Sequence, residues 1–195
     1  MELLFASNNR GKLQEIQKLL PAVLSLSSLK QAGITEELPE PFDTFEQNAW
    51  SKAHYVFEKT GKSCFAEDSG LVVPALDGAP GVFSARYAGL PSDDQKNNEK
   101  LLKNLKEMDH TSAYYQTVIC LILNGTIHYF TGKCEGTLTL NPRGTGGFGY
   151  DPLFMPEGYD QTFAELDLTT KNEISHRGKA MKKLIRFLHD LSLPA

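Results

Sequence analysis

The chain has 195 residues and a formal net charge of −4, with 41% apolar and 23% charged residues. These values are typical of one globular domain, and the acidic balance argues against a broad electrostatic surface for nucleic acid. Any polyanion must therefore be held by a local cluster of cations.

The spacing of the cysteines and the length of the apolar runs indicate the cellular compartment of the protein. The three cysteines lie far apart and show no C-x-x-C spacing, which is typical of a reduced protein without structural zinc. The N-terminus, MELLFASNN, lacks the basic lead and the long apolar core of a signal peptide. No apolar run approaches the roughly 20 residues of a membrane helix. We expect a cytoplasmic protein with no membrane partner.

Predicted strands and helices alternate in the first half of the chain. Apolar patterning predicts strands over 2–6, 24–29, 63–67 with a continuation over 70–76, 113–123, 126–133 and 135–140. Helical spacing predicts helices over 11–20, 44–59, 93–108 and 176–191. Asn124-Gly125 is a strong hairpin signal. The pattern predicts an α/β fold with a mixed sheet flanked by helices, and residues 1–195 contain no linker, so we expect a single domain.

A polar stretch follows the first predicted strand and opens the first predicted helix. It consists of Ser7, Asn8, Asn9, Arg10, Gly11 and Lys12. Backbone N–H groups at a helix start attract anions, and a lysine adds a mobile positive charge, so the stretch fits a phosphate site. It is not a Walker P-loop, which would need Gly in place of Ala6 and Ser or Thr in place of Leu13. The alternative is a polar turn with a solvated lysine.

Two adjacent carboxylates, Glu67 and Asp68, lie between an apolar strand and a glycine in the sequence AEDSG. Because neighbouring side chains of a strand face opposite sides, we expect one carboxylate to be functional and the other to be structural. The functional one would hold Mg²⁺, or orient and deprotonate a water molecule. The alternative is a simple turn at the strand end.

A glycine-rich loop, GTGGFGYDP, follows the last predicted strand. Its glycines permit backbone conformations that other residues avoid, and the rings of Phe148 and Tyr150 can stack on a base. The alternative is a flexible loop whose aromatic rings pack into the core, with Asp151 starting a turn before Pro152.

Cations gather in the sequence KNEISHRGKAMKK. Ser175 is predicted to cap the last helix, which places His176 and Arg177 in its first turn, where positive charge opposes the helix dipole. Because these cations lie where the helix dipole disfavours positive charge, they indicate a site that binds an anion. Together with Lys12 and Lys171 they would form a clamp for a triphosphate in an otherwise acidic protein.

The order of five stretches along the chain resembles the inosine/xanthosine triphosphate pyrophosphatases, a family of noncanonical purine nucleoside triphosphate (XTP/dITP) diphosphatases. The stretches are FASNNRGKLQEI, DTFEQNAWSKA, AEDSGLVVPALDGAPGVFSARYAG, GGFGYDPLF and KNEISHRGKAMKKL. The resemblance implies an elongated mixed sheet with two lobes, a central substrate cleft and a homodimer. It implies Mg²⁺-dependent hydrolysis of ITP, dITP and XTP to the monophosphate and pyrophosphate, with Mn²⁺ as an alternative metal. This activity would cleanse the nucleotide pool.

The resemblance also implies roles for individual residues. Residues 7–12 would bind phosphates, with Lys12 taking part in catalysis. Asp68 would be the proton acceptor or a metal ligand, activating a water that attacks the α-phosphorus. Substrate contacts would come from Ser69, from Phe148, Gly149, Tyr150 and Asp151 around the nucleoside, and from Lys171, His176 and Arg177 on the other lobe.

One position departs from the family pattern T-x-x-E-N-A. Gln47 stands where the family has a metal-binding Glu, so it would contact the metal without bringing charge. The alternative is that Thr44 and Gln47 form a capping box at the start of the helix. Two further alternatives for the whole chain are a non-catalytic nucleotide-binding or sensor protein, weakened at Gln47, and a related Maf-like pyrophosphatase.

Overall fold

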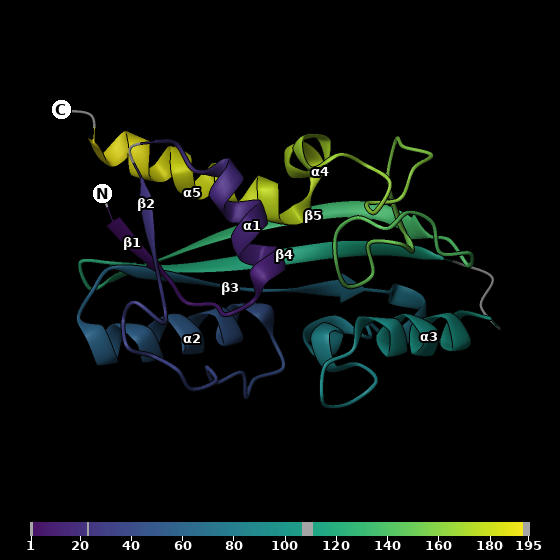
Figure 1. The fold of residues 1–195 in the computed structure, drawn as a ribbon, viewed down its shortest axis with the longest axis horizontal. Helices are drawn as coiled ribbons and strands as arrows, with labels where there is room; N and C mark the ends of the chain where they lie inside the picture. The colour runs from purple at the N-terminus through teal and green to yellow at the C-terminus, as the bar shows by residue number, and fades with distance from the viewer. Residues whose placement is uncertain (1, 23, 107–110, 193–195) are drawn as a thin grey trace. The chain divides into compact units, whose positions relative to one another are not determined.

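The computed structural model describes residues 2–22, 24–106 and 111–192 (Figure 1). Its strands are β1 (Glu2–Phe5), β2 (Ser25–Ser28), β3 (Cys64–Val72), β4 (Ser112–Leu123), β5 (Thr126–Leu138) and β6 (Phe154–Pro156). Its helices are α1 (Arg10–Leu19), α2 (Phe45–Thr60), α3 (Asp94–Leu105), α4 (Leu168–Ile174) and α5 (His176–Ser192). Two short 3₁₀ helices, η1 (Pro74–Leu76) and η2 (Gly81–Arg86), follow β3.

The strands form one six-stranded sheet in the order β2-β1-β3-β4-β5-β6. Strand β1 is parallel to β2 and to β3, whereas β5 and β6 are antiparallel, so the sheet is mixed, as predicted. Asn124 and Gly125 both have positive φ, 49° and 81°, which is the backbone of a tight hairpin turn between β4 and β5. Within the described residues no helix combines the length and apolar character needed to cross a membrane.

The chain divides into two compact units. Unit 1 comprises Met1–Asp68, Thr117–Gly132 and Arg177–Ala195, and unit 2 comprises Ser69–Gln116 and Lys133–His176. The prediction that residues 1–195 form a single domain stays a prediction.

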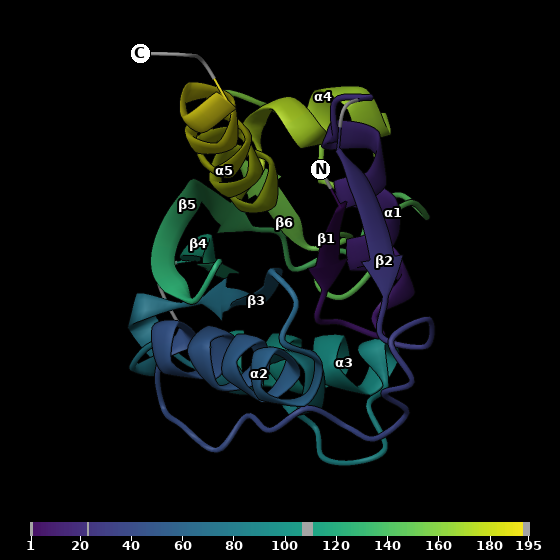
Figure 2. The same ribbon diagram turned by 90° about the vertical axis from the view of Figure 1, so that its left-hand side faces the viewer.

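In unit 1 the alternation of strand side chains builds two cores. On one face of the sheet, Leu4, Ala66 and Ile122 belong to a buried cluster with α2. On the other face, Leu3 and Phe65 belong to a buried cluster with α1 and α5. Figure 2 shows α2 on the opposite side of β1 and β3 from α1 and α5. Burial on both faces therefore fixes the register of β1, β3 and β4 in this unit.

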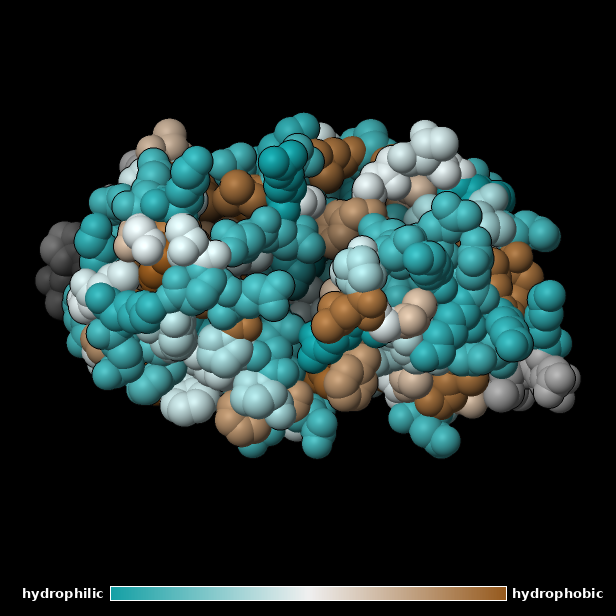
Figure 3. All heavy atoms as spheres, turned by 60° about the horizontal axis from the view of Figure 1, so that its bottom comes forward, coloured by the Kyte–Doolittle hydropathy of each residue, from teal (hydrophilic) through white to brown (hydrophobic). Residues whose placement is uncertain are grey.

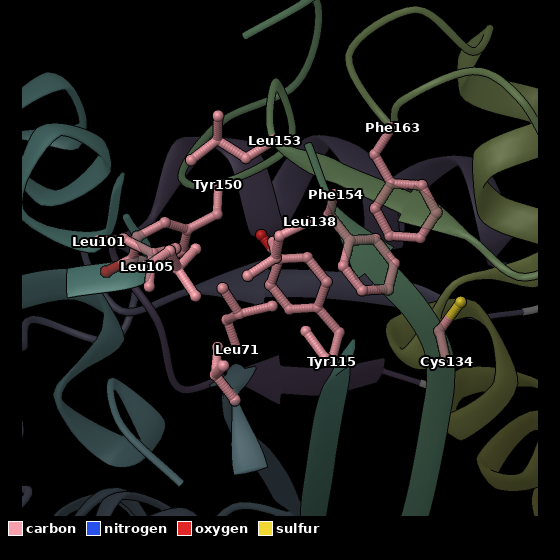
Figure 4. Close-up of a cluster of buried hydrophobic side chains, with 12 residues drawn as sticks. Leu71, Leu101, Leu105, Tyr115, Cys134, Leu138, Tyr150, Leu153, Phe154 and Phe163 are labelled. Atoms are coloured by element: carbon pink, nitrogen blue, oxygen red, sulfur yellow. The ribbon is translucent and has the colours of Figure 1, made fainter. Parts of the chain in front are cut away.

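Unit 2 has one buried cluster, drawn in Figure 4. It joins Leu71 of β3, Tyr115 of β4 and Leu138 of β5 to residues of α3 and of the segment around β6. Two α3 residues, Leu101 and Leu105, belong to the same cluster as Tyr150. On the face drawn in Figure 3, hydrophilic residues dominate and hydrophobic residues form small separate groups.

Two predicted strand breaks are wrong. Strand β3 runs without a break from Cys64 to Val72, so Asp68 and Ser69 lie inside a strand rather than at its end. Strand β5 is likewise continuous over the two strands predicted for 126–133 and 135–140. In both cases pairing with neighbouring strands outweighs local glycines. Helix α4 was not predicted; Asp167 caps it by accepting from two backbone N–H groups. The predicted end of the third helix falls on residues 107–108, outside the described residues.

Candidate active site

The polar stretch after β1 forms the start of α1. Asn9 is the N-cap residue, and its side chain accepts a hydrogen bond from the backbone N–H of Lys12 at 3.0 Å. Ser7 accepts from the backbone N–H of Asn9 at 3.2 Å. Asn8 and Arg10 are exposed, and Gly11 lies in the first turn. The strand-to-helix turn is therefore confirmed, and its phosphate-binding role stays a prediction.

Glu67 is the centre of a buried charge cluster in unit 1. Arg177 donates to it from Nε at 2.9 and 3.0 Å and from Nη2 at 2.9 Å. Arg177 Nη1 donates to Glu15 of α1 at 2.5 Å, and Lys12 Nζ lies 3.1 Å from Glu67 Oε1. Burial acts to raise the pKa of Glu67, but the charges of Arg177 and Lys12 outweigh it and lower the pKa to about 2. Glu67 is therefore ionised and acts as the anchor of two cations.

Asp68 faces a different set of partners. Lys52 Nζ lies 3.1 Å from Asp68 Oδ1, and Asn48 Nδ2 donates to Asp68 Oδ2 at 3.3 Å. Lys52 also forms an ion pair with Glu40. The prediction that Glu67 and Asp68 point to different places is confirmed. Burial raises the pKa of Asp68 above its ordinary value although Lys52 and Lys12 act to lower it.

Glu40, Asn48 and Lys52 were not predicted as site residues from the sequence. Asn48 and Lys52 are four residues apart on α2, and both are buried, 0% and 5% exposed, on a helix face that is otherwise apolar. Polar residues one turn apart on an apolar face were the available signal. Burial acts to lower the pKa of Lys52, but Asp68 and Glu40 outweigh it and raise the pKa above its usual value, so Lys52 stays charged.

Gln47 is bound to Thr44, the N-cap residue of α2. The backbone N–H of Gln47 donates to Thr44 Oγ1 at 3.2 Å, and Thr44 Oγ1 donates to Gln47 Oε1 at 2.9 Å. The first half of the predicted capping box is therefore confirmed, the Gln47 side chain meets the Thr44 hydroxyl, and the metal contact of Gln47 stays a prediction. Among the described residues no group of three or more His, Cys, Asp or Glu side chains is arranged to hold a metal ion. The carboxylates of Asp68 and Glu40, however, converge on one cation, the Lys52 ammonium. Two carboxylates completed by substrate phosphates and water are a donor set that Mg²⁺ accepts.

Unit 2 holds a second group of predicted residues around Asp151. Its Oδ2 accepts from Lys171 Nζ at 2.5 Å and from the backbone N–H of Phe148 at 2.9 Å. The Lys171 ammonium lies 5.2 Å from the centre of the Phe148 ring. Tyr150 is buried in the core and donates from its hydroxyl to the carbonyl of Ser84 at 2.9 Å. The ring of Tyr150 therefore packs as the alternative for this loop predicted, whereas Phe148 is half-buried.

The structure brings two of the four predicted cations, Lys12 and Arg177, to one carboxylate. Lys12 and Arg177 share Glu67 in unit 1, whereas Lys171 and His176 belong to unit 2. The sequence had grouped Arg177 with Lys171 and His176. The His176 ring stacks on Tyr115, with ring centres 4.5 Å apart and planes at 7°. Ser69 is half-buried and directly follows Asp68 in β3.

An open mixed sheet flanked by helices, with a polar strand-to-helix turn after β1 and two buried carboxylates on the neighbouring strand β3, defines an α/β protein with an enzyme-like polar site. A profile of the Ham1 family matches residues 3–187, so the chain belongs to this family. The resemblance seen in the sequence and the predicted α/β fold class are thereby confirmed.

Two relatives and one solved structure agree with this assignment. The dITP/XTP pyrophosphatase of Flavobacterium psychrophilum is 50% identical over 187 residues, which cover 96% of this chain and 98% of the relative. The dITP/XTP pyrophosphatase of Porphyromonas gingivalis is 48% identical over 188 residues, covering 96% and 97%. The structure of a HAM1 protein from Coxiella burnetii is similar with a TM-score of 0.90 at 38% identity, covering 97% of this chain and 99% of that one.

Proposed function

We propose that the protein hydrolyses deaminated purine nucleoside triphosphates, namely ITP, dITP and XTP, to the monophosphate and pyrophosphate. The observation that carries this proposal is the buried Asp68, which forms an ion pair with Lys52. Glu67, the preceding residue of β3, forms an ion pair with Lys12. The similarity to dITP/XTP pyrophosphatases over nearly the whole chain supports the substrate class.

The triphosphate binds at the start of α1. The N–H groups of the first helical turn and the Lys12 ammonium offer positive charge, and Glu67 holds that ammonium close to Asp68 along the strand. Ser7, Asn8, Asn9, Arg10 and Gly11 form the rest of this loop. Arg177 acts behind Lys12, because Glu67 and Glu15 bind its guanidinium inside the protein.

Asp68 is the proton acceptor. Lys52 Nζ at 3.1 Å from its Oδ1 and the Asn48 side-chain amide at 3.3 Å from its Oδ2 hold the carboxylate in a fixed orientation, as a general base requires. Asp68 orients a water molecule towards the α-phosphorus and takes its proton as the oxygen–phosphorus bond forms. The bond between the α-phosphorus and the bridging oxygen then breaks, and pyrophosphate leaves with the electron pair.

Asp68 and Glu40 would hold Mg²⁺, and Gln47 is bound to Thr44. When bound, the ion supplies neutralising charge to the phosphates. Mn²⁺, which takes similar oxygen ligands, is the alternative metal.

The nucleoside contacts the second group of residues. Phe148, Gly149, Tyr150 and Asp151 shape its pocket, and Ser69, Lys171 and His176 touch the substrate. Hydrogen-bond donors aimed at the purine 6-oxygen select keto purines, because the amino group of adenine would leave those donors unpaired. The protein works as a cytoplasmic homodimer in nucleotide metabolism, with neither nucleic acid nor membrane as a partner.

The test is pyrophosphate release from ITP, XTP, dITP, GTP and ATP, with Mg²⁺ and with EDTA. We expect metal-dependent turnover of ITP, XTP and dITP well above that of ATP, whose base carries a 6-amino group, and above that of GTP, and we expect Asp68→Asn to abolish it. Asp167→Asn is the matched control, because Asp167 caps α4 and Asn is an equally good cap. Tight binding of ITP without turnover by the wild type would support the non-catalytic alternative instead.

A further inference from the structure

Helix α3 binds both sides of Gly149 in the glycine-rich loop of unit 2. The backbone N–H of Gly149 donates to Asp94 Oδ2 at 2.7 Å. Asn98 Nδ2 donates to the carbonyl oxygen of Gly149 at 3.0 Å. Because Asp94 and Asn98 are four residues apart, their side chains lie on the same face of the helix. One turn of α3 therefore holds both peptide groups that flank Gly149.

Gly149 needs such support. Its φ is +64°, in the left-handed region, and no heavy atom lies within 4 Å of the position that a Cβ would occupy. A glycine with open space at its Cβ position has few steric limits on its backbone conformation. The two hydrogen bonds from α3 restrict that freedom.

The residues on either side of Gly149 are held by separate contacts. Tyr150 is anchored in the core with Leu101 and Leu105 of the same helix (Figure 4). Phe148 is half-buried, and its backbone N–H donates to Asp151. The hydrogen bonds to the two peptide groups at Gly149 therefore act together with the Phe148–Asp151 contact in orienting the segment that carries the Phe148 ring.

We propose that Asp94 and Asn98 are positioning residues for nucleobase selection. By fixing the peptides at Gly149, they hold Phe148 in the orientation in which it meets the base. This inference rests on the proposed function, in which Phe148 shapes the nucleoside pocket. Neither residue needs to touch the substrate, and neither is part of the Asp68 chemistry.

Asp94→Ala and Asn98→Leu test the inference, and Asp94→Asn is the conservative variant that keeps the contact to the Gly149 N–H. Asp94→Ala removes the acceptor of the Gly149 N–H, whereas Asp94→Asn keeps an acceptor oxygen. Asn98→Leu removes the donor to the Gly149 carbonyl. Asn98 Oδ1 is buried and has no hydrogen-bond partner among the described residues, so a leucine of similar size also removes an unpaired oxygen. We therefore expect Asn98→Leu to leave the thermal midpoint nearly unchanged.

Two residues of the same helix serve as controls. Gln95 is exposed and donates to Glu99 at 2.9 Å, so Gln95→Ala should change nothing at the loop. Asn97 is buried and holds a different segment, accepting from the N–H of Ala88 at 2.7 Å. Asn97→Ala should therefore lower stability without changing base selection.

The readout is the ratio of kcat/KM for ITP to that for ATP. We expect Asp94→Ala and Asn98→Leu each to lower this ratio about fivefold, the effect of one hydrogen bond, mainly through a higher KM for ITP. Asp94→Asn and both controls should keep the wild-type ratio. Hydrogen exchange of the Gly149 amide should be faster in Asp94→Ala than in the wild type.

Three results would contradict the inference or the proposed function on which it rests. An unchanged ratio in Asp94→Ala and Asn98→Leu, even with faster exchange, would overturn the inference while leaving the proposed function intact. If the ratio fell as much in Asn97→Ala as in Asp94→Ala, the change in base selection would follow from a general loss of stability, and the inference would again be overturned. A wild type that does not turn over ITP would refute the proposed function, and base selection with it.

Discussion

The substitution Arg177→Met tests the buried charge cluster of unit 1. Arg177 is 1% exposed and binds two carboxylates, Glu67 at 2.9 Å and Glu15 at 2.5 Å. Methionine fills a similar volume but leaves both carboxylates buried without this cation, which costs about 3–5 kcal/mol of the free energy of unfolding. The pKa of Glu67 gives a similar magnitude, since a fall from 4.5 to about 2 corresponds to about 3 kcal/mol.

The pH dependence gives the sign of the effect. Because the pKa of Glu67 is lower in the folded protein, its stabilisation is fully present above pH 4.5 and is lost as the pH falls towards about 2. The difference in unfolding free energy between wild type and Arg177→Met should therefore be largest at neutral pH and shrink below pH 4.5.

Urea denaturation followed by circular dichroism at several pH values measures this difference. At neutral pH we also expect the thermal midpoint to fall by about 10 °C. Arg186→Met is the matched control on α5, since the Arg186 side chain is 85% exposed and its ion pair to Asp190 is 3.9 Å long. An Arg177→Met protein as stable as the control at neutral pH, or a difference that stays constant in acid, would refute the reasoning.

Three further predictions concern the cap of α2, the ligands of Mg²⁺ and the glycine-rich loop. Thr44→Ala should lose the N-cap bond of α2 and about 1 kcal/mol of stability, which thermal unfolding would show as a fall of about 2–4 °C. In Mg²⁺ titrations of the reaction rate, Gln47→Glu should leave the apparent Mg²⁺ affinity unchanged, whereas Glu40→Gln should lower it. A changed affinity in Gln47→Glu with an unchanged affinity in Glu40→Gln would instead identify Gln47 as the ligand. Gly147→Ala places a Cβ 1.9 Å from Asp151 Oδ2 at a φ of +72°, so kcat/KM for ITP should fall, and wild-type kinetics would count against the loop's role.

Local contacts are the part of this molecule that the sequence could predict. The N-cap bond between Thr44 and Gln47 and the hairpin turn at Asn124 each join residues a few positions apart. Each depends on a residue type at a fixed offset. The opposite orientation of Glu67 and Asp68 follows from the alternation of strand side chains in the same way.

The partners of the charged residues could not be predicted, because they are distant in sequence. Arg177 reaches Glu67 across 110 residues, and Lys52 reaches Asp68 across 16 and Glu40 across 12. Composition alone does not say which of many carboxylates a buried cation meets. The pairing of Asp68 and Ser69 within β3, between the two predicted strand segments, was missed for the same reason, since it depends on neighbouring strands.

Hydrolysis of ITP in oxygen-18 water, with ATP in the same mixture and mass analysis of the products, tests the central claim most directly. The proposed attack on the α-phosphorus predicts one labelled oxygen in IMP, none in the pyrophosphate, and little conversion of ATP. Label in the pyrophosphate, release of inorganic phosphate with IDP, or equal consumption of ATP would contradict it.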